Sequence, residues 1–422
     1  MAEKNLWKAI GPGLLFAGAA IGVSHLVQST RAGAVYGFAL VGLVILANLA
    51  KYPAFRFGPQ YAAATGTSLL EGYRRQGRFA LVIYLLLTLG TMFTVQAAVA
   101  LVCAGLFKVM LGLSTPAPVL AIALMAVCAL LLAVGRFKAL DGVNKLIVAV
   151  MTVSTVIATA LAVPQVDWGA MRFWPTGDQF SVADIAFYAA LVGWMPSAID
   201  IAVWNSLWTL ARKEATGHQP SVRESLFDFN LGYWGTAILA LCFVTLGAAV
   251  MHGRGVAFAD GAGGFAAQVI DLYVANLGEW ARPVISICAF AVMFSTTLTV
   301  VDGFPRALAV LWQRFRGPEA PWQAEEAAPT FRRAYWASLA VLAVGTGVVL
   351  QVLLTSLKQF VDLATILSFL TAPVLAWLNH RAIHAPEVPA EHRPSTALRL
   401  GSLAGLLFLG GFALYYLWLR LA

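Results

Sequence analysis

The chain has 422 residues, of which 60% are hydrophobic and 11% are charged, and its formal net charge is +8. A soluble domain carries about 25% charged residues, so this composition excludes a soluble protein and indicates an integral membrane protein in contact with the lipid bilayer. The positive charge does not indicate a nucleic-acid partner, because the basic residues are dispersed over short connections between apolar runs. There is no nucleophile beside a base and no phosphate-binding loop, so we expect no enzyme, no cofactor and no obligate protein partner.

Eleven segments are apolar enough to cross a membrane, which takes about 20 helical residues. The predicted fold class is therefore all-α and integral to the membrane. The expected spans have the approximate limits 9–37, 38–62, 79–111, 116–134, 141–163, 182–211, 227–251, 284–312, 333–355, 358–382 and 397–420. We expect the connections 164–181 and 252–283 to be surface loops, and 315–332 to be a linker.

The distribution of the Lys and Arg residues predicts how these spans are oriented in the membrane. The connections on the side that begins with the N-terminus hold roughly three times as many basic residues as those on the other side, and basic residues concentrate on the cytoplasmic side of a membrane. We therefore expect a cytoplasmic N-terminus and, because the number of spans is odd, an external C-terminus. The expected location is the bacterial cytoplasmic membrane.

The first span is interrupted in its middle by small and polar residues, namely Gly22, Ser24, His25, Gln28 and Ser29. A lipid-facing helix does not place a histidine at membrane depth, whereas a broken helix that lines a cavity does. His25 is also the one histidine expected at this depth. Two interpretations stay open for it: a group that binds cargo or carries a proton, and a packed, hydrogen-bonded side chain.

The sixth span is interrupted in the same way. Gly193, Met195, Pro196 and Ser197 lie at its centre, and Asp200 follows. Pro196 has no backbone N–H and disfavours a continuous helix. Interrupted helices at matching places in two halves of a chain are typical of inverted-repeat transporters, whose site lies between the breaks near the bilayer midplane.

Four short motifs resemble features of the Nramp family of divalent-metal transporters. They are GPG at 11–13, AGA at 32–34 followed by Gly37, MP at 195–196 and STTLT at 295–299. This resemblance implies a LeuT-type fold, in which residues 1–163 and 182–382 form two inverted repeats of five helices each and 397–420 is an additional span. It also implies that helices one and six are broken.

The departures from the family concern its cargo site. Where the family has Asp-Pro-Gly-Asn in the first broken helix, this chain has the four residues 22–25 (GVSH), without a carboxylate. Where the family has Met-Pro-His-Asn in the second, this chain keeps Met195 and Pro196 and continues with Ser197 and Ala198. The acidic residues of the family's third helix are absent here. The chain is therefore expected to be a divergent member with a remodelled site.

The resemblance and the two breaks together give the candidate site. The residues expected to bind cargo are Gly22, Ser24, His25, Met195, Ser197 and Asp200. Among them, His25, Met195 and Asp200 are the expected metal ligands, and imidazole and thioether groups suit the softer transition-metal ions. Asp200 has an alternative interpretation, a structural ion pair with Arg31 or His25.

Further polar residues lie on the eighth span. The hydroxyls of Ser295, Thr296 and Thr297 are a possible coupling-ion site, with helix packing as the alternative. Asp302 is expected to pair with Arg306 four residues later. Asp141 and Asp362 are expected to be charges at helix N-termini.

These observations predict an Nramp-related secondary transporter that moves divalent metal cations by alternating access. The alternative is a transporter of the same fold that has lost metal transport and carries a small organic solute, coupled to Na⁺ or H⁺. The missing carboxylate of the first break favours the alternative, whereas the family resemblance and Met195 favour the metal.

Overall fold

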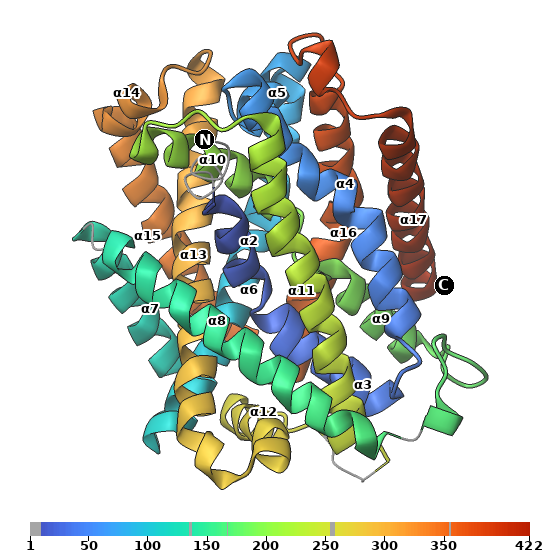
Figure 1. Ribbon diagram of the computed structural model, residues 1–422. Helices are drawn as coiled ribbons and strands as arrows, with labels where there is room; N and C mark the ends of the chain where they lie inside the picture. The colour runs from blue at the N-terminus through green and yellow to red at the C-terminus, as the bar shows by residue number, and fades with distance from the viewer. Residues whose placement is uncertain (1–9, 135–136, 167, 254–257, 354–355) are drawn as a thin grey trace.

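The computed structural model describes residues 10–134, 137–166, 168–253, 258–353 and 356–422, and these residues form helices without any strand (Figure 1). Each of the eleven predicted spans coincides with helix. Nine of them follow single long helices: α4 (Val41–Thr65), α6 (Arg78–Leu111), α7 (Ala117–Ala133), α8 (Phe137–Ala162), α11 (Val222–Val250), α13 (Arg282–Arg316), α15 (Pro329–Val352), α16 (Leu357–Ile383) and α17 (Thr396–Leu421). Six helices in the described residues are long and apolar enough to cross a membrane by themselves.

The first and sixth spans are broken, as predicted. The first consists of α2 (Pro12–Ala20), the π-helix η1 (Ser24–Ser29) and α3 (Thr30–Tyr36), with a bend of 43° at the break. The sixth consists of α9 (Val182–Trp194) and α10 (Asp200–Thr216). The first broken helix lies inside the molecule, where α2 packs against α10, α11 and α13 (Figure 1). In contrast, α17 packs on the outside against α4, α9 and α16.

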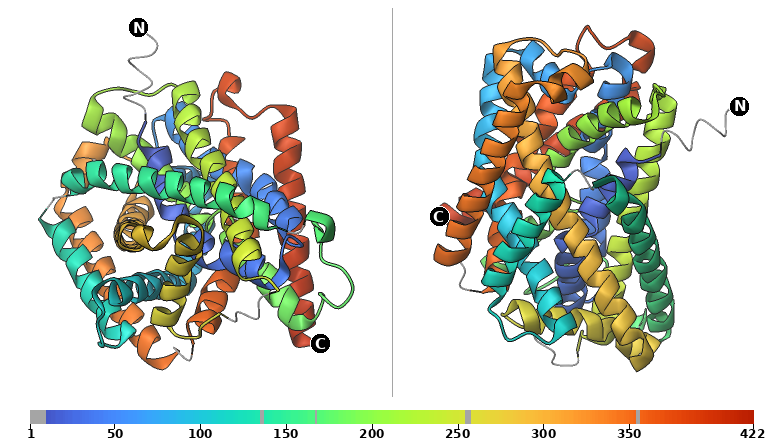
Figure 2. Two further views of the ribbon diagram at one scale, coloured as in Figure 1. Left: turned by 60° about the horizontal axis from the view of Figure 1, so that its bottom comes forward. Right: turned by 90° about the vertical axis from the view of Figure 1, so that its left-hand side faces the viewer.

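The expected surface loop 252–283 contains a helix, so the prediction for that connection was wrong. Residues 252–283 include α12 (Ala262–Leu277), which packs against α6 beneath the long spans (Figure 2). Phe265, Val269 and Tyr273 are four residues apart, so they share one face of α12, and all three are buried. The region 315–332 contains the short helix α14 (Trp322–Ala327), and α5 (Leu69–Gln76) lies between α4 and α6.

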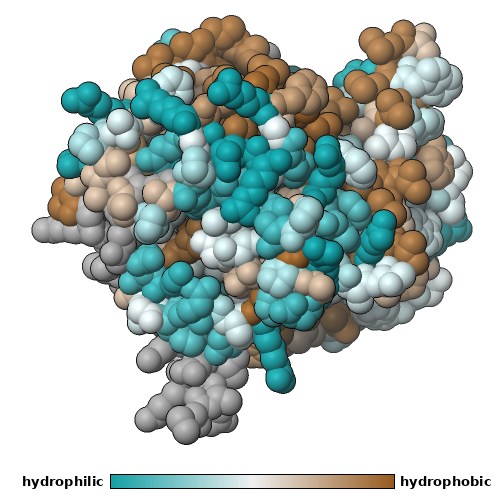
Figure 3. All heavy atoms as spheres, turned by 90° about the horizontal axis from the view of Figure 1, so that it is seen from above, coloured by the Kyte–Doolittle hydropathy of each residue, from teal (hydrophilic) through white to brown (hydrophobic). Residues whose placement is uncertain are grey.

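One end of the molecule is hydrophilic. Figure 3 shows polar side chains gathered over the end that carries α5 and α14, with apolar side chains at its rim. A buried carboxylate, Glu71, ties this end together, because it accepts hydrogen bonds from Arg74 and Arg75 and lies 3.6 Å from Arg314. Arg74 and Arg75 belong to the side that the sequence predicts to be cytoplasmic.

Glycines allow α3 and α11 to pack backbone to backbone. A Cβ atom at Gly33 would clash with the Val244 carbonyl oxygen, and a Cβ at Gly247 would clash with that of Thr30. Small residues at helix interfaces permit this close approach in membrane proteins. The half of the first broken helix that follows its break is thereby fixed against α11.

Gly247→Ala should therefore destabilise the protein by about 1–3 kcal/mol, the usual cost of overpacking a well-packed interface. The measurement is thermal unfolding in detergent. Gly235→Ala on the same helix is the matched control, because a Cβ at Gly235 would meet nothing within 4 Å. Equal stability of the two variants would contradict the close packing of α3 on α11.

Candidate functional site

The first break exposes backbone carbonyls that side chains then cap. Because α2 ends at Ala20, the carbonyls of its last turn lose their intrahelical donors. The Thr296 hydroxyl of α13 lies 2.8 Å from the Gly18 oxygen. The Ala20 oxygen accepts a hydrogen bond from the Ser24 hydroxyl and lies 2.8 Å from His25 Nδ1. The polar residues of the first break are therefore used largely to satisfy its own backbone.

The second break comprises residues 195–199, between α9 and α10. Pro196 cannot donate the hydrogen bond that the Val192 carbonyl would receive in a continuous helix. The Met195–Pro196 peptide bond is cis. Met195 is extended, so the chain leaves the helical path after Trp194. The Val192 oxygen accepts a bond from the Met195 N–H at 3.3 Å, and its second lone pair can accept a further bond from elsewhere.

A lysine from another helix donates hydrogen bonds to carbonyls at this break. Lys51 lies on α4, and its side chain is fully buried. Its Nζ atom is 3.0 Å from the oxygen of Val192, 2.9 Å from that of Gly193 and 2.7 Å from that of Ser197. An ammonium group has three N–H donors, and here each has one acceptor. Our sequence interpretation missed this residue.

A small cavity of about 30 Å³ lies between the two breaks. Four of the predicted residues line it, namely Ser24, Ser197, Asp200 and Thr296, together with Ala19, Val23, Val95, Val99, Trp194, Ala198, Ile201, Trp204, Val300 and Phe304. All of these residues are buried, so the cavity lies inside the protein. Its size is sufficient for a single water molecule or bare ion.

Two polar atoms of the cavity lining have no hydrogen-bond partner among the described residues: Asp200 Oδ1 and Trp204 Nε1. Asp200 is 2% exposed and begins α10. Its carboxylate interacts electrostatically with the Lys51 ammonium but makes no direct ion pair within the described part of the chain. Leaving a buried carboxylate oxygen unpaired is costly, so this atom lacks the partner that a buried charge needs.

The structure does not bring the three predicted metal ligands together. His25 points toward α11, where its Nε2 lies 2.8 Å from the Thr236 oxygen, so both ring nitrogens face backbone carbonyls. Neither His25 nor Met195 lines the cavity. Among the described residues, no group of three or more His, Cys, Asp or Glu side chains could hold a metal ion. Gly22 is also outside the lining, and a Cβ there would lie 2.8 Å from the Thr296 methyl group.

Two of the three residues proposed for a coupling ion, Thr296 and Thr297, donate hydrogen bonds to backbone oxygens. Thr296 bonds the first break, as described above, and the Thr297 hydroxyl donates to the Met293 oxygen of its own helix at 2.8 Å. Ser295 is buried. The expected pair on α13 is confirmed, because Arg306 binds both carboxylate oxygens of Asp302 at 2.9 and 3.0 Å.

Arg31 forms an ion pair with Asp362, which the sequence analysis had interpreted as a helix N-terminal charge. Its guanidinium binds both oxygens of Asp362 on α16, at 2.7 and 3.1 Å. Asp362 was expected to be a helix N-terminal charge, and Arg31 was a candidate partner of Asp200, so both of these interpretations were wrong. Gln28 of η1 also donates to Asp362. The pair therefore connects the first broken helix to α16. The side chain of Asp141 lies outside the described part of the chain.

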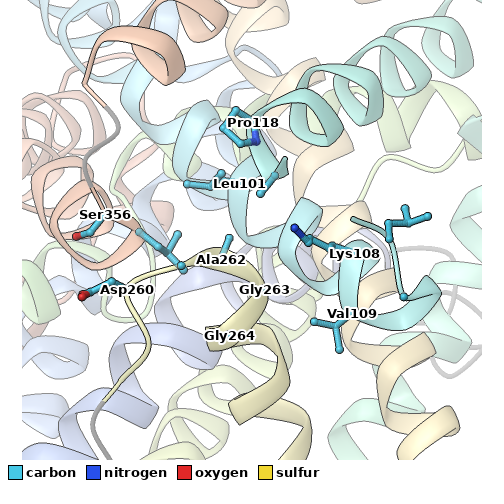
Figure 4. Close-up of a pocket in the computed structure, with 14 residues that line it drawn as sticks. Leu101, Lys108, Val109, Pro118, Asp260, Ala262, Gly263, Gly264 and Ser356 are labelled. Carbon is cyan, nitrogen blue, oxygen red and sulfur yellow. The ribbon is translucent and has the colours of Figure 1, made fainter. Parts of the chain in front are cut away.

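A second, larger pocket of about 700 Å³ lies away from the breaks, between the ends of α6, α7, α12 and α16. Figure 4 shows it with Lys108 on one side and Asp260 and Ser356 on the other. No residue of either break lines it. The sequence analysis singled out none of its residues as a candidate site.

The comparisons with known proteins agree with this architecture. A sequence model of the Nramp family (natural resistance-associated macrophage protein-like) matches residues 13–419. An uncharacterised protein of Pasteurella multocida is 36% identical and aligns over 98% of this chain and 94% of its own length. A mutant of the Eremococcus coleocola manganese transporter superimposes with a TM-score of 0.70 at 14% identity, covering 98% of this chain and 86% of that one.

The fold is shared with transporters of other cargo. Mhp1, a nucleobase-cation-symport-1 family transporter with bromovinylhydantoin bound, has a TM-score of 0.58 at 14% identity over 96% of this chain and 92% of that one. Similarity at this level shows the fold alone. Together with the two broken helices, it identifies the architecture as a LeuT-type fold. The chain belongs to the Nramp family, a family of membrane transporters and not of enzymes.

Proposed function

We propose that this protein transports a divalent metal cation through the space between its two broken helices. The observation that carries the proposal is the buried, unpaired carboxylate oxygen of Asp200, a residue that lines a cavity large enough for one ion. Ser24, Ser197 and Thr296, whose side chains carry hydroxyl oxygens, line the same cavity. This is an all-oxygen set, and oxygen ligands suit Mg²⁺ and Mn²⁺ better than the soft ions that His25 and Met195 had suggested.

The cavity lies inside the protein, so transport requires it to open to each side of the membrane in turn. In an inverted-repeat transporter one group of helices rocks against the other around the central site. We assign residues 1–163 and 182–382 to the two repeats and 397–420 to an additional helix. The basic residues at the hydrophilic end support a cytoplasmic N-terminus and an external C-terminus in a bacterial cytoplasmic membrane.

A small organic solute is the second candidate cargo, and one observation favours it. Lys51 occupies the carbonyls of the second break and brings a positive charge close to Asp200. Around Lys51 and Asp200 the site thus has no net negative charge to attract a divalent cation. Coupling to Na⁺ or H⁺ would then involve Ser295, Thr296 or Thr297 on α13.

Uptake into proteoliposomes distinguishes these two candidates. With an internal metal-sensitive dye, we expect Mn²⁺ and Mg²⁺ to enter with saturable kinetics, whereas protein-free vesicles should stay dark. Because the proposed ligands are oxygen atoms, Zn²⁺ should compete with Mn²⁺ for uptake no better than Mg²⁺ does. Absence of uptake of any divalent ion by folded protein would reject the metal and leave the organic solute.

A further inference from the structure

Lys51 is a buried charged residue that does not line the proposed cargo cavity. It lies on α4, which packs against both halves of the second broken helix. Its ammonium is completely enclosed, and its three nearest acceptors are backbone oxygens of residues 192, 193 and 197. These oxygens come from both sides of Pro196, so the lysine bridges the break.

The acceptors are arranged as they would be for a free cation. Three carbonyl oxygens converge on one point, and carbonyls released at a helix break are the groups that coordinate Na⁺ in transporters with broken helices. The Phe55 ring, 5.7 Å from Nζ, adds a favourable π face. The nearby carboxylate of Asp200 adds a negative charge. Without the lysine, the position would be an oxygen-lined, negatively polarised site.

We infer that Lys51 is a tethered cation, which occupies the carbonyl site of the second break in place of a free ion. It holds the end of α9 and the start of α10 in position and compensates the charge of Asp200. The protein therefore does not bind a free monovalent cation at this break. The inference concerns the break itself and holds whichever cargo the neighbouring cavity receives.

Shortening the side chain should convert the position into a binding site for free cations. In Lys51→Ala the carbonyls remain while the ammonium and its stem are removed. We expect this variant to unfold at a lower temperature than the wild type in detergent. Methylammonium, which carries three N–H donors, should raise its Tm by several degrees, and Na⁺ should do so to a smaller extent. Tetramethylammonium at equal concentration should not, because it has the charge but no N–H donor.

Lys51→Met is the matched control for the volume that the lysine side chain fills. Methionine fills nearly the same volume but has no donor, so this variant should be destabilised and should not respond to methylammonium. Adding Asp200→Asn to Lys51→Met should recover part of the lost Tm, because the uncompensated carboxylate is removed. The wild type should respond equally to methylammonium and tetramethylammonium.

The inference is overturned if Lys51→Met is as stable as the wild type, or if Lys51→Ala responds alike to methylammonium and tetramethylammonium. If Lys51→Ala cannot be purified in ordinary buffers, the same comparison is made during purification. Recovery of folded protein with methylammonium but not with tetramethylammonium supports the tethered cation. Failure with both overturns it. None of these measurements depends on transport, so they stay separate from the test of the cargo.

Discussion

Replacing Asp200 with asparagine should strongly reduce uptake of the transported cation while leaving the protein folded. The substitution keeps the size of the side chain and removes its charge. A charge-assisted interaction contributes about 1.5–3 kcal/mol, so we expect uptake of Mn²⁺ at subsaturating concentration to fall roughly 10- to 100-fold. The effect is large because Asp200 is the one carboxylate among the residues that line the cavity.

The fold should tolerate this change. The Oδ1 atom of Asp200 makes no hydrogen bond within the described residues that the substitution would remove. Lys51 loses a nearby negative charge but keeps its three carbonyl acceptors, so the Tm should fall by no more than a few degrees. Uptake and thermal unfolding are measured on the same preparation. Asp271→Asn is the control for loss of a carboxylate elsewhere, because Asp271 is exposed on α12 and pairs only with the exposed Arg282 in the described structure. Normal uptake by Asp200→Asn would exclude this carboxylate from the cargo site.

The fold was largely predictable, because its determinants are local. Long apolar runs define most spans, and Pro196 marks the second break through the N–H that it lacks. The first break was predictable from polar residues at membrane depth. The helix α12 was missed because its 16 residues are shorter than a span and its apolar spacing was not weighed.

The candidate site was predictable only in part. Ser24, Ser197 and Asp200 line one cavity, and each lies at or beside a predicted interruption. Thr296 lines the same cavity from α13. His25 does not line this cavity, and its geometry agrees with the alternative of a packed, hydrogen-bonded side chain. The sequence shows that this residue is deep but not the direction in which the π-helix turns it. Its ring faces the carbonyl of Thr236 on α11.

Lys51 lies near the middle of the predicted second span, where an ionisable residue signals a function. The sequence therefore contained a signal for this residue, but not for its partners. Its role depends on α4 packing against a break that lies 141 residues later in the chain. Arg31 and Asp362 illustrate the same difficulty, since 331 residues separate them. A single sequence contains no signal for pairings at such separations.

Breaking the ion pair between Arg31 and Asp362 should lower the stability of the protein and also change the access of solvent to the cavity. Arg31 is 5% exposed and Asp362 23% exposed, so the pair lies between a buried and a surface ion pair. Breaking a buried pair costs about 3–5 kcal/mol and a surface pair at most about 1 kcal/mol, so Asp362→Ala should cost about 2 kcal/mol. Thermal unfolding measures this loss, and Asp271→Ala, in an exposed pair, should cost less.

The same pair links the half of the first broken helix that follows its break to α16, on the side that we assign to the exterior. Its loss should favour opening of the cavity to that side. A cysteine placed at Ser197, in a variant without the native cysteines, should then react faster with a membrane-impermeant thiol reagent added outside. The double reversal of Arg31→Asp with Asp362→Arg should slow the reaction again. Unchanged labelling in Asp362→Ala would show that the pair stabilises the fold without controlling access, because a closure that depends on this contact cannot survive its removal.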